Sequence, residues 1–95
     1  MTVATPETTE HVTIFYADWC PFCAKLLKAL NRTETPYALV DVEAEGTEDI
    51  NEWIKSVNDG NRIVPTVLYS DGTSVTNPAA SAVRKKLAEL DGSAE

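Results

Sequence analysis

The sequence predicts an α/β domain with a four-stranded mixed sheet flanked by three helices, in the order β-α-β-α-β-β-α. Three observations support this prediction. Short apolar runs rich in β-formers alternate with longer stretches whose apolar residues recur at helical spacing. A whole helix separates the first two runs, which makes those strands parallel. An Asp-Gly pair separates the last two runs, which is typical of a hairpin.

The first half of the chain predicts a strand, a helix and a second strand. Residues 12–16, VTIFY, are too uniformly apolar for an exposed strand and suit a central one. Pro21 fits the first position of a helix, and apolar residues then follow at helical spacing up to Leu30. Residues 37–42, YALVDV, form the predicted second strand, which completes a β-α-β unit.

The second half predicts a helix, a hairpin and a last helix. Thr47 is a suitable N-cap for the second, amphipathic helix. Strands are expected at residues 66–69 and 74–76, on either side of the Asp-Gly turn. Asn77 and Pro78 suit the N-cap and the first position of the last helix.

Length and composition limit the classes of function. The 95 residues allow one domain, expected at residues 11–92 with flexible ends at 1–10 and 93–95. The net charge of −7 would repel nucleic acids and anionic membrane surfaces. No apolar run approaches the ~20 residues of a membrane span, and the start lacks the features of a signal peptide. We therefore expect a cytoplasmic monomer with no nucleic-acid or membrane partner.

Cys20 and Cys23 are the two cysteines of the chain, and their CxxC spacing points to redox or metal chemistry. Cys20 comes where the first strand gives way to the first helix, so its sulfur should lie among the free N–H groups of the first turn. These donors and the helix dipole favour a thiolate. Cys23 should be the less exposed sulfur. An exposed Cys20 thiolate beside a second thiol is suited to thiol–disulfide exchange.

Two other interpretations of this cysteine pair stay open. A structural zinc site needs four ligands, and His11 is the single histidine, so carboxylates or a second chain would have to complete it. The cysteines could also form a small buried apolar pair. We favour exchange chemistry, because a CxxC at a strand-to-helix junction is typical of it, and we expect no metal.

The motif CPFC after an opening strand, with GNRIVPT about forty residues later, resembles the glutaredoxin branch of the thioredoxin fold. The resemblance covers about residues 11–90 and implies the same order of elements. It also implies a cis peptide bond before Pro65, beside Cys20. The backbone of Val64 would then pair with the cysteine moiety of a thiol substrate, as an added strand does.

The thiol that such a protein uses depends on residues that vary within the family. Glutathione-using glutaredoxins commonly carry a basic residue shortly before the first cysteine and a Gly-Gly turn before the last helix, and this chain has neither. The WSGFRPD-like segment of the electron donors to ribonucleotide reductase is also missing. The combination of WCxxC, GNRxVPT, DG and TNP instead resembles the mycoredoxins. These are reductases of bacteria that use mycothiol, a sugar-linked cysteine without the two carboxylates of glutathione.

The resemblance implies a thiol-disulfide oxidoreductase in which Cys20 attacks mycothiol–protein mixed disulfides and a second mycothiol then frees it, with Cys23 optional. Substrate-binding residues are expected at Trp19, Phe22, Val64, Pro65, Thr66, Thr76 and Asn77. No tightly bound cofactor is implied, since mycothiol is a co-substrate and NADPH supplies electrons through a mycothione reductase. The alternatives are a glutathione-dependent glutaredoxin, an electron donor to ribonucleotide reductase, and a module in which two chains hold an iron–sulfur cluster.

Three residues of the motifs and one acidic segment also have structural interpretations. Trp19 is expected to be exposed beside the site, where it either shapes a hydrophobic rim for substrates or shields the site. Phe22 is either a rim residue or the first core contact of its helix, and its spacing to Leu26 favours the core. Arg62 is expected to cap the preceding helix or to bind an acid such as Asp59, with a ligand contact as the alternative. Residues 41–52 contain six acids and no base, and we expect them to form a solvated face.

Overall fold

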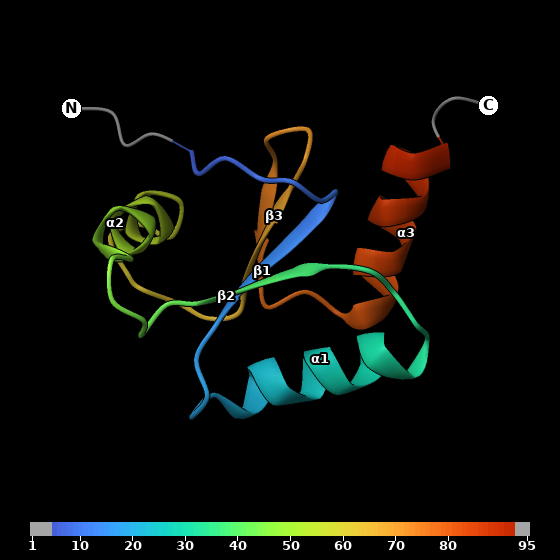
Figure 1. Ribbon diagram of the computed structural model, residues 1–95, viewed down its shortest axis with the longest axis horizontal. Helices are drawn as coiled ribbons and strands as arrows, with labels where there is room; N and C mark the ends of the chain where they lie inside the picture. Colours follow the sequence, from blue (N-terminus) through green and yellow to red (C-terminus); the bar gives the residue numbers. More distant parts are fainter. Residues whose placement is uncertain (1–4, 93–95) are drawn as a thin grey trace.

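The computed structural model describes residues 5–92 and confirms the predicted α/β class and order of elements (Figure 1). The elements are β1 (Val12–Tyr16), α1 (Pro21–Arg32), β2 (Ala38–Asp41), α2 (Glu48–Ser56), β3 (Thr66–Tyr69), β4 (Ser74–Thr76) and α3 (Ala80–Gly92). β2 is one residue shorter at each end than predicted. The flexible ends expected at residues 1–4 and 93–95 lie outside the described residues, and residues 5–10 form neither helix nor strand.

The four strands form one mixed sheet in the order β2-β1-β3-β4. β1 is parallel to β2 and antiparallel to β3, which continues through a turn into antiparallel β4. Ile14 of β1 lies opposite Leu39 of β2 and Val67 of β3. β1 and β3 are the central strands, and they are buried along almost their whole length because helices cover both faces of the sheet.

α2 covers one face of the sheet, and α1 and α3 cover the other (Figure 1). Successive side chains of β1 show this division, because neighbouring residues of a strand point to opposite faces. Phe15 packs against Trp53 of α2, with the ring centroids 5.5 Å apart. Ile14 lies in the other cluster, which contains Leu30 of α1 and Val83 of α3.

The last helix begins later than the sequence predicts. α3 starts at Ala80, and the carbonyl of Ala79 accepts its first backbone hydrogen bonds. Asn77 is not the N-cap, because it has a φ of 48° at the end of β4 and its N–H donates to the carbonyl of Pro65 at 2.8 Å. The expectation that Asn77 and Pro78 start the helix is therefore wrong. The bond to Pro65 instead connects β4 to the segment before β3.

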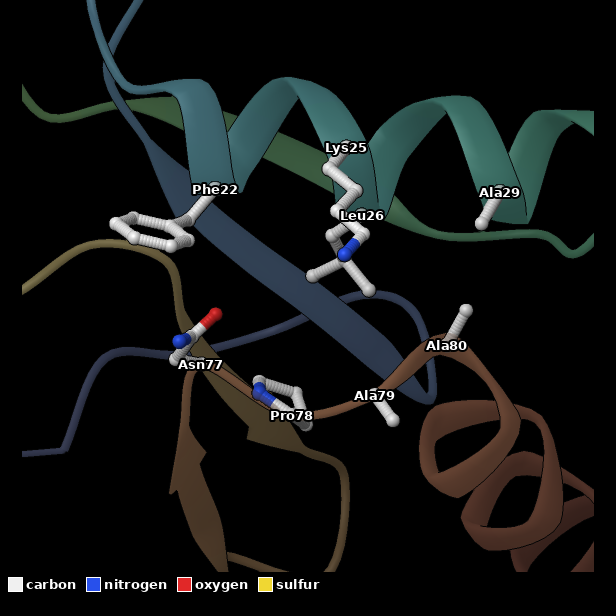
Figure 2. A pocket seen from close by; sticks show the side chains of 8 residues that line it. All are labelled: Phe22, Lys25, Leu26, Ala29, Asn77, Pro78, Ala79 and Ala80. Atoms are coloured by element: carbon white, nitrogen blue, oxygen red, sulfur yellow. The ribbon is translucent and has the colours of Figure 1, made fainter.

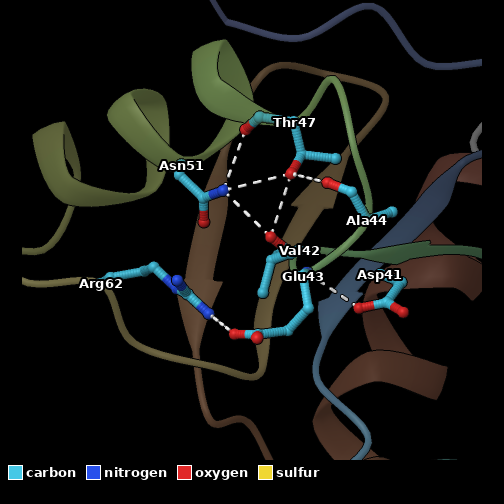
Figure 3. Close-up of polar contacts among 7 residues, drawn as sticks. All are labelled: Asp41, Val42, Glu43, Ala44, Thr47, Asn51 and Arg62. Carbon is cyan, nitrogen blue, oxygen red and sulfur yellow. Dashed lines mark hydrogen bonds and ion pairs between the residues drawn. The ribbon is translucent and has the colours of Figure 1, made fainter.

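The segment between β2 and α2 is held by side chains in a way that the sequence did not predict. Thr47 precedes α2, but its hydroxyl donates to the carbonyls of Val42 at 3.0 Å and Ala44 at 2.7 Å (Figure 3). The side-chain amide of Asn51 also donates to the Val42 carbonyl, at 3.0 Å. These bonds fix a segment that contains Glu43.

Candidate active site

Cys20 is the N-cap of α1, at the point where the chain leaves β1 and enters the helix. Its backbone is extended, with φ −88° and ψ 111°, and Pro21 occupies the first helical position. The Sγ atom of Cys20 accepts a hydrogen bond from the N–H of Cys23 at 3.1 Å. A backbone N–H of the first turn, which has no partner within the helix, therefore points at this sulfur.

The expectation that Cys20 is exposed is wrong. Its exposed fraction is 3%, and that of Cys23 is 1%. The reason is that both cysteines pack in the apolar cluster on the α2 face, where the Cys20 thiol donates to the carbonyl of Val64 at 3.6 Å. Cys20 still borders the surface, since it lines a depression of about 180 Å³ together with Tyr16 and Asp18.

Cys23 has the chemistry of a buried thiol. Burial raises the pKa of Cys23 well above its ordinary value, and its hydrogen bond with Cys20 raises this pKa further. Cys23 is therefore protonated at neutral pH. Both cysteines are free thiols. The pair thus consists of one sulfur that accepts a backbone N–H and one deeper sulfur that keeps its proton.

The peptide bond between Val64 and Pro65 is cis, as the resemblance implied. The carbonyl of Val64 faces the Cys20 sulfur, and the carbonyl of Pro65 accepts the N–H of Asn77 at 2.8 Å. Three segments therefore meet around the sulfur: the start of α1, the cis-proline segment and the end of β4.

The hydroxyls of Thr66 and Thr76 form hydrogen bonds inside the protein. The hydroxyl of Thr66 is buried, donates to the carbonyl of Ile63 at 2.7 Å and accepts from the Asn58 amide at 3.3 Å. The hydroxyl of Thr76 donates to the side-chain oxygen of Asn58. Through these bonds both threonines stabilise the cis-proline segment, and the expectation that they bind substrate stays a prediction.

Large apolar side chains that neighbour the site residues in the sequence are exposed. Trp19 is 65% exposed, as predicted. Phe22 is 60% exposed, so the preferred interpretation of it as a core contact is wrong, because α1 directs Cys23 toward the sheet and leaves Phe22 outside. Sequence reasoning missed Ile63, which is also exposed, and the available signal was its position next to Val64.

A groove of about 470 Å³ runs between α1 and the segment that enters α3 (Figure 2). Figure 2 shows Phe22 and Leu26 on one side, and Asn77 and Pro78 on the other. Lys25 also lines the groove, and no acidic residue does. The sequence predicted substrate binding by Phe22 and Asn77, whereas the place of Lys25 and Pro78 in the same groove is seen only in the fold, which brings the two segments together.

Arg62 forms an ion pair with Glu43 and not with Asp59 (Figure 3). Hydrogen bonds from Arg62 and then from Trp19 hold the pKa of Glu43 below its ordinary value. One of the acids expected on a solvated face is therefore a fixed carboxylate next to Trp19. The sequence did not indicate this pair, because 19 residues separate its partners.

Within residues 5–92, no group of three or more His, Cys, Asp and Glu side chains is arranged to hold a metal ion. In the same part of the chain, no helix has both the length and the apolar character that crossing a membrane requires.

Comparison with known proteins identifies the family. Residues 12–75 match the glutaredoxin family. Mycoredoxin 1 of Corynebacterium glutamicum is 56% identical over 80 residues, which cover 84% of this chain and 96% of that protein. A putative glutaredoxin of Mycobacterium tuberculosis is 40% identical over 84 residues, which cover 88% of this chain and 98% of that protein. The crystal structure of the glutaredoxin of Methanosarcina mazei Go1 matches with a TM-score of 0.67 at 22% identity. The match covers 82% of this chain and 78% of that protein, which therefore shares the fold. The chain therefore belongs to the glutaredoxin family of thiol–disulfide oxidoreductases, in which a mycoredoxin is among its relatives.

Proposed function

We propose that the protein reduces mixed disulfides between mycothiol and protein thiols, with Cys20 as the nucleophile. The observation that carries this proposal is the position of the Cys20 sulfur, which accepts the N–H of Cys23 at the start of α1 and faces the carbonyl of Val64. Thiolates attack disulfides, and a helix N-terminus stabilises a thiolate. The similarity to a mycoredoxin supports mycothiol as the thiol.

The cycle has two exchange steps. In the first, the Cys20 thiolate attacks the mycothiol sulfur of the mixed disulfide, a bond forms between Cys20 and mycothiol, and the protein thiolate leaves and takes a proton from solvent. In the second, the thiolate of a free mycothiol attacks the mycothiol on Cys20. The disulfide of two mycothiols is released, and Cys20 returns to its thiolate. NADPH, through a mycothione reductase, supplies the two electrons that convert this disulfide back to two thiols.

Cys23 is optional in this cycle. A protonated, buried thiol attacks slowly, so Cys23 forms a disulfide with Cys20 only as a side branch or in reactions with dithiols. One sulfur is sufficient for the main cycle, which therefore needs no second copy of the chain. The dependence on NADPH and on free thiols fits the reducing environment of the cytoplasm.

The lining of the groove that begins at Phe22 supports the proposal that the substrate is a sugar-linked thiol. A sugar has apolar ring faces that pack on aromatic side chains, and hydroxyls that need hydrogen-bond partners. Phe22 and Pro78 offer the apolar surface, and the side chains of Asn77 and Lys25 offer the polar groups. The proposal thus keeps Asn77 as a ligand-binding residue, now by its side chain in this groove.

Glutathione fits the same surface less well. It carries two carboxylates, whereas Lys25 is the cation that lines the groove and Arg62 is already paired with Glu43. A charge-assisted hydrogen bond contributes about 1.5–3 kcal/mol. One missing contact therefore corresponds to a preference of about tenfold or more for mycothiol.

The test is the turnover of one client peptide prepared as a mixed disulfide with mycothiol and, separately, with glutathione. Each substrate is assayed with its own free thiol and its own NADPH-dependent reductase. We expect kcat/KM to be at least about tenfold higher with mycothiol. Comparable or faster turnover with glutathione would overturn the choice of mycothiol and return the protein to the glutathione-dependent members of its family.

A further inference from the structure

Arg62 and Glu43 form an ion pair that connects two loops at the edge of the site (Figure 3). Glu43 belongs to the segment between β2 and α2, and Arg62 to the segment between α2 and β3. The guanidinium donates to the carboxylate, and the side chains are 33% and 47% exposed, respectively. Both charged groups are therefore within reach of a ligand in solution.

Two contacts relate this pair to the reacting sulfur. Arg62 precedes Val64 by two residues, and the carbonyl of Val64 faces the Cys20 sulfur at 3.6 Å. Trp19 immediately precedes Cys20, and its side chain helps to lower the pKa of Glu43, so it lies beside this carboxylate. The ion pair therefore adjoins both segments that frame the sulfur.

The structure holds the Glu43 carboxylate in place. The backbone N–H of Glu43 donates to the Asp41 side chain at 2.9 Å, and the neighbouring Val42 carbonyl accepts hydrogen bonds from Thr47 and Asn51 (Figure 3). The hydrogen bonds from Arg62 and Trp19 also lower the pKa of Glu43, so the carboxylate is ionised at neutral pH.

An occupied guanidinium has a direct consequence for ligand charge. The planar guanidinium of Arg62 would otherwise suit the carboxylate of a ligand. A ligand carboxylate must instead displace Glu43, which is tethered beside Arg62 and so acts at high local concentration. It also meets a second like charge at Asp18, which lines the depression next to Cys20. An uncharged thiol meets neither obstacle.

We propose that Glu43 is a specificity-determining residue. It occupies the guanidinium of Arg62 and so disfavours the reaction of Cys20 with mixed disulfides whose small thiol carries a carboxylate. The inference rests on the proposed function, because it names the residue that selects the class of thiol. The exchange step is unchanged. The Cys20 thiolate attacks the small-thiol sulfur of the mixed disulfide, a disulfide forms between Cys20 and the small thiol, and the client thiolate leaves and takes a proton.

The test uses two substrates that differ in a single charge. One uncharged peptide is prepared as a mixed disulfide with N-acetylcysteine, which has one carboxylate, and with its uncharged amide. The second-order rate constant for release of the peptide thiol is measured in single turnovers. Glu43→Gln should raise the ratio of the carboxylate rate to the amide rate by about tenfold, since it frees Arg62. A structural effect common to both substrates cancels in this ratio.

Two further variants separate the local pair from general charge. In the double variant E43Q/R62Q, the gain should be mostly lost, because no guanidinium is freed. Glu45→Gln makes the same change in net charge at an exposed residue that forms no ion pair within residues 5–92, and it should leave the ratio unchanged.

Three results would overturn the proposal: an unchanged ratio in E43Q, an equal gain in E45Q, or a full gain in the double variant. The mycothiol and glutathione comparison on the unmodified protein is independent of this ratio. The proposed function and the role of Glu43 can therefore fail separately.

Discussion

Cys20 and Cys23 lie three residues apart at the start of α1 but have different chemistry. The Cys20 sulfur accepts a backbone N–H, whereas burial raises the pKa of Cys23. The thiolate is the reactive form of a cysteine, so the position at the helix start matters more than the small difference in exposure between the two side chains. The proposed cycle therefore depends on one sulfur.

Substitution of each cysteine tests this difference. Cys20→Ser should reduce turnover of the mycothiol mixed disulfide to the uncatalysed rate, because a serine hydroxyl does not attack the disulfide. Cys23→Ser should stay within about tenfold of the unmodified protein, because Cys23 takes part only in a side branch. Steady-state kcat/KM provides the comparison, and thermal unfolding checks that both variants fold. Equal losses in the two variants would contradict the assignment of Cys20 as the sole nucleophile.

Sequence reasoning predicted the position of Cys20 at the helix start and the cis bond before Pro65, but it misjudged the exposure of Cys20 and Phe22. It placed Cys20 at the helix start because the strand-to-helix junction is a local pattern. It did not reveal that Cys20 is covered, since Val64 lies 44 residues away in the sequence. The exposure of Phe22 was also misjudged, because helical spacing alone does not say which apolar residue of a first turn faces the sheet.

At the level of elements, β1, α1, β3 and β4 match their predicted positions because hydrophobic pattern, turn residues and the helix-starting proline all agree. The start of α3 was mispredicted for a tertiary reason. Asn77 and Pro78 fit a helix start locally, but the hydrogen bond from Asn77 to Pro65 holds that residue in a left-handed conformation. This tertiary hydrogen bond overrides the preference of Asn77 and Pro78 for a helix start, and the helix begins at Ala80.

The hairpin turn is connected to α3 through Asp71. Its carboxylate accepts the backbone N–H of Thr73 at 3.0 Å and pairs with Lys86 at 2.8 Å. Lys86 first, and then Thr73, hold the pKa of Asp71 well below its ordinary value. Because this pKa is lower in the folded state, ionised Asp71 stabilises the fold above the unfolded value of about 3.9. The contribution is lost as the pH falls below that value toward the folded pKa.

Asp71→Asn should therefore lower the free energy of unfolding at pH 7 and make its decline toward low pH shallower. Urea denaturation between pH 7 and pH 2 measures both effects. Asp59→Asn is the matched control, since Asp59 is exposed and forms no ion pair within the described residues, and its profile should parallel that of the unmodified protein. An identical pH dependence in the Asp71 variant and the unmodified protein would show that the link to α3 contributes nothing.

Over the whole molecule, the sheet brings together segments that are far apart in the chain. The start of α1, the cis-proline segment and the end of β4 were each indicated by a motif or by the family resemblance. The pair of Glu43 and Arg62 was not, because a surface charge in a sequence with 15 acids and eight bases has many possible partners. Glu43 and Arg62 come together only when α2 and its two flanking loops are packed on the sheet.

The net charge of −7 should affect charged thiols in addition to this local pair. Repulsion between the protein and an anionic substrate is long-ranged at low salt, because the Debye length falls from about 30 Å at 0.01 M to about 10 Å at 0.1 M. The rate constant for the N-acetylcysteine mixed disulfide should therefore rise by about twofold or more when NaCl is increased from about 0.01 to 0.5 M. The rate for the uncharged amide should change little, since neither screening nor repulsion acts on it.

A decrease with salt for the carboxylate substrate would contradict this prediction, because it would mean that a cation such as Lys25 attracts the substrate more strongly than the net charge repels it. Repeating the titration with Lys25→Gln would identify that cation, as the decrease would then disappear.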